Sequence, residues 1–248
     1  MDVKLISGPV RTFAEKIGIR GVGRLRLRRD CLLCLGETSA GGVCQNCEHF
    51  LAPAGVRCPR CALPLAQEGA CGDCLRLPPA FDDIVTAFDY RFPVDRLVRR
   101  FKFSGDLAVG VYLGEALARR VAASGTRPDF VLASPASAAR LRERGFDAAL
   151  LLARRVRSRL GLRLDARSLV KVRHTPAQAG LSRGQRQDNL RDAFAVRRPF
   201  TGLHLAVVDD VMTTGVTLSS LATLLRRAGA RRVSGWVVAR TPEPAGGG

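Results

Sequence analysis

The sequence predicts an α/β protein with a mostly parallel sheet flanked by helices, preceded by a small Cys-rich double zinc ribbon. Apolar strand-like runs alternate with helical patterns from residue 84 onward, which is typical of chains that build parallel sheets. Before them, all eight cysteines lie between residues 31 and 74. At 248 residues and 46% hydrophobic content, the chain can form one large domain, or a medium domain with a small one.

The cysteines form four C-x-x-C pairs, and each cysteine of the first two pairs recurs 27 residues later. Both sets read C-x₂-C-x₉-C-x₂-C, which indicates an internal duplication of a tetrathiolate site. Because four thiols leave no ligand position open for a substrate, we expect two structural zinc ions. The expected ligands are Cys31, Cys34, Cys44, Cys47, Cys58, Cys61, Cys71 and Cys74.

Other interpretations of the cysteines remain open. A disulfide scaffold conflicts with the basic N-terminus, which lacks the apolar core of an export signal. A redox pair does not explain four pairs in register. Two consecutive sites are the simplest pairing, while an interleaved pairing uses the same ligands. His49 is a further candidate ligand, although four thiols already fill each site.

The elements beyond the cysteines follow in a regular order. Paired prolines in the segment 75–83 stop regular structure and mark a boundary. We expect a basic segment at 1–29, the double zinc ribbon at 30–76 and the α/β domain at 80–242. The expected strands are 84–90, 130–134, 205–210 and 233–239, and the expected helices are 111–124, 146–160 and 218–229. Gly125 and Gly161 follow two of these helices, where glycine commonly ends a helix.

A polar segment, KVRHTPAQAGLSRGQRQDNLRD at 171–192, interrupts this order. It is too polar to pack and too long for an ordinary connection. Segments of this kind are either disordered or form lids over a binding site, and a lid is the favoured interpretation.

The stretch HLAVVDDVMTTGVTL at 204–218 indicates where a ligand binds. Asp209 and Asp210 end a strand-like run, at the sheet edge where ligands of parallel sheets bind. A turn of small residues then leads to a helix N-terminus, whose free N–H groups and dipole favour an anion. The acids can accept hydrogen bonds from vicinal hydroxyls while the turn holds a phosphate, so the pattern predicts a sugar phosphate. An N-capped helix after a buried strand is the plainer alternative, but it leaves the paired acids unexplained.

The segment VVDDVMTTGVT resembles the phosphoribosyl pyrophosphate (PRPP) motif of type I phosphoribosyltransferases. Together with the double zinc ribbon, KFSG at 102–105, RLRERGF at 140–146 and TPAQAGLSRGQRQDNL at 175–190, it resembles the ComF family. That family comprises phosphoribosyltransferase-like proteins linked to DNA uptake in natural competence. The resemblance implies a type I phosphoribosyltransferase-like domain at 80–242, with the segment 171–192 as a flexible hood.

The resemblance also implies a set of site residues. The acid pair would bind the ribose hydroxyls, and the loop after it would grip the 5′-phosphate. Lys102 would sit in a loop facing the pyrophosphate, with the arginines of 140–144 in a second loop above it. PRPP usually arrives with Mg²⁺, held largely by substrate oxygens and water. The implied catalytic residues are Asp209, Asp210, Lys102 and Arg144. The implied PRPP-binding residues are Val211, Met212, Thr213, Thr214, Gly215, Val216, Thr217, Ser104, Gly105, Arg140 and Arg142.

The chain departs from the family pattern on the acceptor side. Where the family usually carries P-V-P before the second loop, this chain reads ASPASAAR at 133–140. Where the family reads G-F-N-Q, this chain has Asp147 and Ala148 in the last two positions. The PRPP-binding half of the pattern is intact, while the acceptor molecule is not specified by these residues.

The net charge of +18 favours partners that carry phosphate, and 36 of the 40 basic residues are arginine. Arginine-rich coding of solvated positions explains the same excess without a partner. Candidate partners are PRPP, single-stranded DNA and proteins of the DNA-uptake apparatus. No apolar stretch is long enough for a membrane span, and we expect a cytoplasmic protein. The hypotheses are a phosphoribosyltransferase, a nucleic-acid-associated competence protein and a PRPP sensor.

Overall fold

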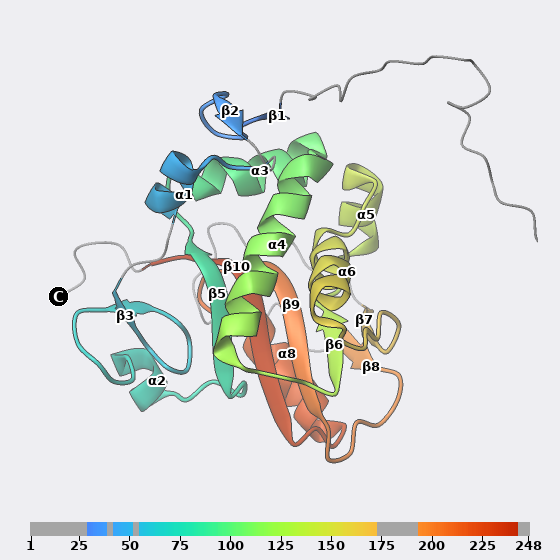
Figure 1. Cartoon of the computed structure of the whole chain (residues 1–248). Coiled ribbons are helices and arrows are strands. Elements are labelled where there is room, and N and C mark those ends of the chain that lie inside the picture. The colour runs from blue at the N-terminus through green and yellow to red at the C-terminus, as the bar shows by residue number, and fades with distance from the viewer. Residues whose placement is uncertain (1–28, 39–41, 52–54, 173–192, 243–248) are drawn as a thin grey trace, which may run out of the picture.

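The computed structural model describes residues 29–38, 42–51, 55–172 and 193–242 (Figure 1). The basic segment expected at 1–29 therefore lies outside the described residues except for its last position. The hood expected at 171–192 also lies outside them, except for residues 171 and 172.

A four-stranded parallel sheet forms the centre of the chain. Its order is β5 (Asp83–Asp89), β10 (Arg232–Arg240), β9 (His204–Met212) and β6 (Phe130–Ala133), and each neighbouring pair is parallel. These are the four strands that the sequence predicts, with no end displaced by more than two residues. Both faces of the sheet are covered, which is why the strands read as nearly continuous apolar runs.

The three predicted helices cover the two faces of this sheet (Figure 1). Helices α4 (Leu107–Ser124) and α6 (Ala148–Leu160) lie on one face, and α8 (Val216–Arg227) lies on the other. Both α4 and α6 end at glycines in the left-handed conformation, as predicted. Helix α4 starts four residues earlier than predicted, because the Asp106 carboxylate caps it by accepting a hydrogen bond from the Val109 N–H (3.2 Å). Within the described residues no helix is both long and apolar enough to cross a membrane.

Two further helices occupy segments where we expected loops. Helix α3 (Val94–Ser104) includes most of the KFSG segment, and α5 (Ala138–Arg144) includes most of RLRERGF. The expectation of loops at these two segments was therefore wrong. Helix α3 buries Val94, Leu97, Val98 and Phe101, which have the spacing of one helical face. The hairpin of β7 (Leu169–Lys171) and β8 (Phe194–Val196) joins the two ends of the polar segment.

The sheet separates two hydrophobic cores. One core lies between the sheet and α3, α4 and α6, and contains Val208 and Leu113. The other lies between the sheet and α8, and contains Val207 and Leu221. Adjacent residues of β9 thus enter different cores, as the two-residue period of a strand requires.

Two small Cys-rich units precede the sheet and share one plan. The first ribbon consists of β1 (Arg29–Asp30), β2 (Glu37–Thr38) and α1 (Gln45–Leu51). The second ribbon consists of β3 (Val56–Arg57), β4 (Pro64–Leu65) and α2 (Gly72–Arg76). Each has one antiparallel strand pair followed by a short helix. The first ribbon packs into the core of α3, α4 and α6, and the second packs into the core of α8.

Candidate functional site

The acid pair lies near the carboxyl end of β9, next to the start of α8. Asp209 and Asp210 belong to the strand, which continues to Met212 and so is two residues longer than predicted. The threonines at 213–214 are exposed in the turn that follows, and α8 begins at Val216. The predicted order of strand, small polar turn and helix is confirmed.

Gly215 gives the turn its shape. Its φ of 77° lies in the left-handed region that favours glycine. A Cβ at this position would lie 2.5 Å from the Met212 Cε and 3.6 Å from the ring of Phe81. Gly215 is the N-cap of α8 and has no side chain to bond the first N–H groups of that helix. The backbone there is suited to an anion, and any larger residue at 215 would strain the fold as well as narrow the turn.

The apolar residues of the motif hold the turn in place by packing. Met212 and Val216 are buried in the core of α8, and Val211 packs against the core on the other face. Thr217 is half-buried in the first turn of α8. The side chains of these apolar residues therefore anchor the loop, while Thr213 and Thr214 are exposed.

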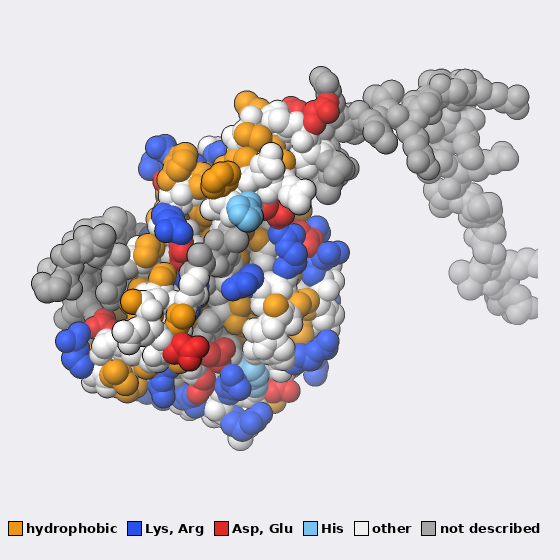
Figure 2. All heavy atoms as spheres, turned by 60° about the vertical axis from the view of Figure 1, so that its left-hand side comes forward, with side chains coloured by type: hydrophobic (Ala, Val, Ile, Leu, Met, Phe, Trp, Pro, Cys, Tyr) orange, Lys and Arg blue, Asp and Glu red, His pale blue; other side chains and the backbone are white. Residues whose placement is uncertain are grey.

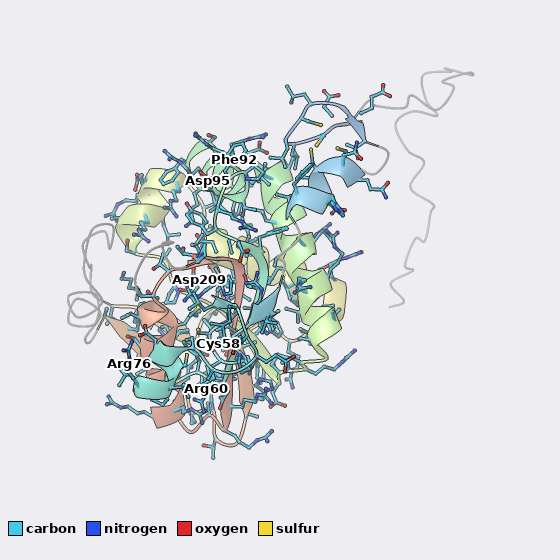
Figure 3. The ribbon with its side chains drawn as sticks, turned by 90° about the vertical axis from the view of Figure 1, so that its left-hand side faces the viewer. Cys58, Arg60, Arg76, Phe92, Asp95 and Asp209 are labelled. Atoms are coloured by element: carbon cyan, nitrogen blue, oxygen red, sulfur yellow. The ribbon has the colours of Figure 1, made fainter. Side chains whose placement is uncertain are left out.

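Asp209 is held in a setting that resists ionisation. Burial and the adjacent charge of Asp210 raise the pKa of Asp209 to about 7. The nearby Lys102 and a hydrogen bond with the Ser134 side chain act in the opposite direction. In the view of Figure 3, Asp209 lies between Phe92 and Cys58.

Lys102 contacts the second acid directly. Its Nζ lies 2.8 Å from Oδ1 of Asp210, and both side chains are more than four-fifths buried. Asp210 also accepts a hydrogen bond from the Val211 N–H at 2.6 Å. Lys102 reaches the sheet edge from the last turn of α3 rather than from a loop, since the amphipathic face of α3 anchors that helix to the core. The structure thus joins a residue of the KFSG segment to the acid pair.

The rest of KFSG meets the α5 segment. Gly105 ends α3 in the left-handed conformation, and a Cβ there would lie 3.9 Å from the Phe146 ring. The Arg144 guanidinium carbon lies 5.3 Å from the ring centre of Phe103, in cation–π geometry. Ser104 is the exposed last residue of α3. The two segments that the resemblance places around the pyrophosphate are therefore neighbours.

Arg140 and Arg142 are exposed on α5, and Arg144 is half-buried. They lie on a helix and not in the loop that we expected. Burial, followed by the charge of Arg140, lowers the pKa of Lys171, so Arg140 lies close to the hairpin at the base of the polar segment.

Asp147 is a third acid near the pair, which sequence reasoning treated only as a departure from the family pattern. It caps α6 by accepting a hydrogen bond from the Leu150 N–H (3.0 Å). Burial raises its pKa, and the charge of Asp210 raises it further, whereas backbone N–H groups act against both. The signal for its capping role was present, because aspartate before a helical pattern is typical of an N-cap.

Arg240 is a residue of the site that sequence reasoning missed. It is the last residue of β10, is 7% exposed and pairs in register with Met212. Its guanidinium donates to the carbonyl of Thr213, at the start of the turn, and to that of Cys61 (3.1 Å). No sequence signal separates it from the other arginines, since it simply follows an apolar strand.

The cysteines form two clusters of four, each from consecutive pairs, so the interleaved pairing was wrong. In each cluster the sulfurs all lie within 4.8 Å of one another, and the cysteines are free thiols rather than disulfides. The distance between the Cys34 and Cys44 sulfurs is 3.8 Å, and between those of Cys61 and Cys71 it is 3.5 Å. A tetrahedral zinc site with Zn–S bonds of about 2.3 Å places its sulfurs about 3.8 Å apart. Both clusters therefore fit a four-coordinate metal ion.

The same backbone hydrogen bond stabilises a thiolate in each cluster. The Cys44 N–H donates to the Cys31 sulfur (3.3 Å), and the Cys71 N–H donates to the Cys58 sulfur (3.4 Å). Burial opposes ionisation of both thiols, but the backbone N–H groups outweigh it. The pKa of Cys31 falls to about 6 and that of Cys58 to about 7. Each cluster thus has one sulfur prepared to bind a metal as a thiolate.

Known proteins resemble this chain over most of its length. DNA utilization protein YhgH of Salmonella typhimurium is 35% identical over 219 residues, which cover 85% of this chain and 96% of that protein. Competence protein F of Haemophilus influenzae is 31% identical over 222 residues, with the same two coverages. A solved glutamine PRPP amidotransferase from B. subtilis is 24% identical with a TM-score of 0.37, over 52% of this chain and 25% of that one. No family model matches the chain.

The covered parallel sheet, with its ligand motif at the carboxyl edge and two Cys₄ ribbons ahead of it, defines the class: a type I phosphoribosyltransferase-like protein with a Cys-rich double ribbon. Within this class, the chain belongs to the family of DNA utilization protein YhgH and competence protein F, which is the ComF family that its motifs indicated.

Proposed function

We propose that this protein binds PRPP together with Mg²⁺ at the acid pair and the loop 211–217. One arrangement supports the proposal above all others. Asp209 and Asp210 stand directly before a left-handed glycine turn at a helix N-terminus, with Lys102 held 2.8 Å from Asp210. A diol and a phosphate separated by one sugar ring match this order of acceptors and donors.

Each group has a role that its chemistry supports. Asp209 and Asp210 accept hydrogen bonds from the two ribose hydroxyls. The backbone N–H groups of 213–217 and the threonine hydroxyls hold the 5′-phosphate. Lys102 and Arg144 face the pyrophosphate, with Ser104, Gly105, Arg140 and Arg142 around them.

We propose phosphoribosyl transfer as the reaction. The bond between the anomeric carbon and the pyrophosphate oxygen breaks, and a bond forms from that carbon to the nucleophile of an acceptor. Bound Mg²⁺ would neutralise part of the pyrophosphate charge. The cations of α3 and α5 stabilise the negative charge that develops on the leaving group, so the protein acts by positioning and electrostatics.

The alternative to transfer is that the same site senses PRPP without catalysing a reaction. Asp147 places a third buried carboxyl near Asp210. Transfer predicts release of pyrophosphate when the acceptor is present, while sensing predicts PRPP binding without pyrophosphate release. A pyrophosphate assay over candidate bases and amines distinguishes the two.

Calorimetric titration with PRPP and Mg²⁺ tests the proposal. We expect a saturable isotherm for the native chain and none for the double variant Asp209→Asn/Asp210→Asn. Asp82 and Asp83 form a matched control pair at the other edge of the sheet, where they contact Arg226 (2.6 Å) and Arg232 (3.0 Å). Asp82→Asn/Asp83→Asn should keep the isotherm, provided that thermal unfolding confirms its fold. Absence of heat at millimolar PRPP, or an unchanged isotherm in the first variant, would falsify PRPP binding.

A second candidate function is association with single-stranded DNA or with proteins of DNA uptake. Its support is the net charge of +18, the relatives' names and one groove. The groove, about 620 Å³ in volume, lies between the first ribbon and α3. It is lined by Phe50 (80% exposed) and Phe92 (77% exposed) together with Arg91 and Arg96. Hydrophobic side chains gather beside basic ones at the upper end of this face (Figure 2).

Fluorescence anisotropy with a labelled single strand tests the second function. Binding should weaken steeply as salt rises, because phosphate contacts release counterions. Phe50→Ser/Phe92→Ser should weaken binding if bases stack in the groove, while Leu75→Ser at an exposed position of α2 in the second ribbon should not. Binding that ignores salt, or fails at low salt, removes this candidate.

We also propose zinc as the metal of both clusters, with a structural role. Free thiols in both clusters fit a reducing compartment, and the cytoplasm is the proposed location. The division into a basic segment at 1–29, a double ribbon at 30–76 and a phosphoribosyltransferase-like domain at 80–242 completes the proposal.

A further inference from the structure

One buried guanidinium connects the second ribbon to the ligand loop. Nε of Arg240 donates to the Cys61 carbonyl (3.1 Å), on the side of the second ribbon. Nη1 donates to the carbonyls of Met212 (3.4 Å) and Thr213, and to that of Thr241. The guanidinium therefore bonds a metal-ligand residue of the ribbon on one side and the first residues of the ligand turn on the other.

The chemistry of arginine suits this connection. Its planar fork holds donors at fixed angles, so it can bond two chain segments at once, and it stays charged when buried. A cation that is 7% exposed needs nearby negative charge or dipoles. The carbonyls supply dipoles. The second cluster, which includes Cys61, would add a net charge of about −2 when four thiolates bind one Zn²⁺. A phosphate bound in the turn would add further negative charge on the side of the guanidinium that faces Thr213.

Packing between the turn and the second ribbon is incomplete, although both contribute side chains to the core of α8. A cavity of about 280 Å³ lies between them, lined by Cys61, Cys74, Thr214, Gly215 and Arg240 among others. Part of this interface is therefore open, and the hydrogen bonds of Arg240 bridge it. Loss of the guanidinium would leave the carbonyls on both sides without these donors.

The first ribbon has no comparable connection to the loop in the contacts of the described residues. It is tied to α3 by the Arg100 donor to the Leu32 carbonyl (2.5 Å) and to α4 by Arg119 and Glu48 (2.9 Å). The internal duplication thus supplies a matched pair of clusters, and among the described residues a buried side chain, Arg240, connects the second of them to the loop.

We propose that Arg240 is a positioning residue that makes the shape of the loop 213–217 depend on the second cluster, and not on the first. When the second cluster holds its metal, the Cys61 carbonyl is fixed and Arg240 holds the turn ready for an anion. When that metal is lost, the turn loosens. The effect on ligand affinity rests on the proposed PRPP site, whereas the effect on the loop itself does not.

Hydrogen exchange of the full chain, followed by mass spectrometry, tests the coupling without ligand. The readout is the peptide spanning 211–221, which includes the Ser219 N–H bonded to the Gly215 carbonyl (2.9 Å). We expect Cys74→Ser and Arg240→Met each to speed its exchange by about tenfold or more. Cys47→Ser should leave that peptide unchanged while losing the same amount of metal by elemental analysis.

Arg57 provides a second control within the same ribbon. It donates to the Ala62 carbonyl (3.0 Å) and to Asp89 (2.8 Å), so it docks the second ribbon without reaching the turn. Arg57→Met should not speed exchange in 211–221. Arg240→Lys keeps the buried charge but cannot bond both sides, and it replaces Arg240→Met if that variant does not fold. We expect the Arg240→Lys variant to retain its metal and still to exchange faster in the peptide 211–221.

PRPP titration of the same variants measures the consequence for the ligand. Arg240→Lys should weaken binding by roughly tenfold to a hundredfold, the range of one charge-assisted hydrogen bond. If the native chain does not bind PRPP, the proposed function fails while the exchange result still decides the coupling. Unchanged exchange in folded Arg240→Lys, or equal exchange in Cys74→Ser and Cys47→Ser, would overturn the coupling.

Discussion

The two ribbons have the same cysteine spacing and the same N–H to sulfur bond, yet they differ in burial. The four cysteines of the second cluster are all buried, between 2% and 6% exposed. In the first cluster only Cys31 is buried, and Cys34 is exposed. The second ribbon also docks through an ion pair between Arg57 and Asp89, whose side chains are 14% and 7% exposed. A duplicated motif can therefore keep its metal geometry while its two copies take different structural roles.

The largest expected difference follows from removing one ligand in each copy. Cys74→Ser and Cys47→Ser should each lower bound zinc from about two to about one per chain. Cys74→Ser should reduce the free energy of unfolding by about 5 kcal/mol, because all four cysteines of its cluster are buried, and Cys47→Ser by about half of that. Elemental analysis and urea unfolding measure both quantities. Equal losses of stability would contradict the comparison, and unchanged metal content would refute the ligand assignment.

The second largest difference is expected between the ion pairs that dock the two ribbons, in how much each contributes to the free energy of unfolding. Arg57→Met leaves buried Asp89 with the longer ion pair to exposed Arg91 (3.5 Å) among the described residues, and it should reduce the free energy of unfolding by about 3 kcal/mol. Arg119→Met removes an exposed pair with Glu48 and should cost less than about 1 kcal/mol. Chemical denaturation of both variants at one pH measures the two losses in the free energy of unfolding. A larger loss for Arg119→Met would reverse the interpretation of which ribbon is more firmly docked.

Two acids, Asp209 near the turn and Asp106 near the first ribbon, should change the stability of the fold in opposite directions as pH varies. Asp209, whose folded pKa is about 7, holds its proton more tightly when folded, so its contribution to stability falls as pH rises from about 4 to about 7. Asp209→Asn should therefore raise the free energy of unfolding at pH 8 by about 2 kcal/mol, with little change at pH 4.

Asp106, beside the first ribbon, is the matched acid of opposite sign. Although burial opposes it, hydrogen bonds from Val109 and Arg100 lower its pKa. Its contribution is present above the unfolded pKa of about 4 and is lost as pH falls through the lowered folded value. Asp106→Asn should thus be destabilising at pH 8. If the change in the free energy of unfolding has the same sign for Asp209→Asn and Asp106→Asn at pH 8, the expected directions are wrong.

The smallest expected effect concerns Tyr112, which packs under the first ribbon. Its hydroxyl is buried and has no hydrogen-bond partner among the residues that the structure describes. Tyr112→Phe should change the free energy of unfolding by less than about 1 kcal/mol, in the stabilising direction. Thermal unfolding and metal content check it. A marked loss of either would mean that the hydroxyl supports the first cluster.

Much of the fold was predictable because its signals are local. The cysteine register predicted the two clusters, and the apolar runs predicted all four strands of the sheet. Helices α3 and α5 were missed because the likeness of KFSG and RLRERGF to family loops was preferred. Helix α5 buries none of its side chains, so a helical apolar spacing is present in α3 alone. The face made by Val94, Leu97, Val98 and Phe101 was available as a signal.

The candidate site was predictable in one half. The motif at 209–217 is contiguous in sequence, so its acids, turn and helix could be identified together. Lys102 was expected at the site through the family resemblance, whereas Asp147 and Arg240 were not. The three come from α3, the start of α6 and β10, and no spacing in the chain predicts that they approach the motif. The strand order places the ends of β9 and β10 side by side, and the packing of α3 and α6 against the sheet brings Lys102 and Asp147 to them.

The sequence alone predicted two tetrathiolate sites among the eight cysteines, the parallel α/β domain and the acid-pair motif at 209–217, because each depends on residues close together along the chain. Tertiary structure decided which ribbon enters which core and which cysteine pairs combine, and it brought Arg240 to the turn. Such contacts depend on how helices and strands far apart in sequence pack to bury their apolar faces. A single sequence does not encode that packing in any local pattern.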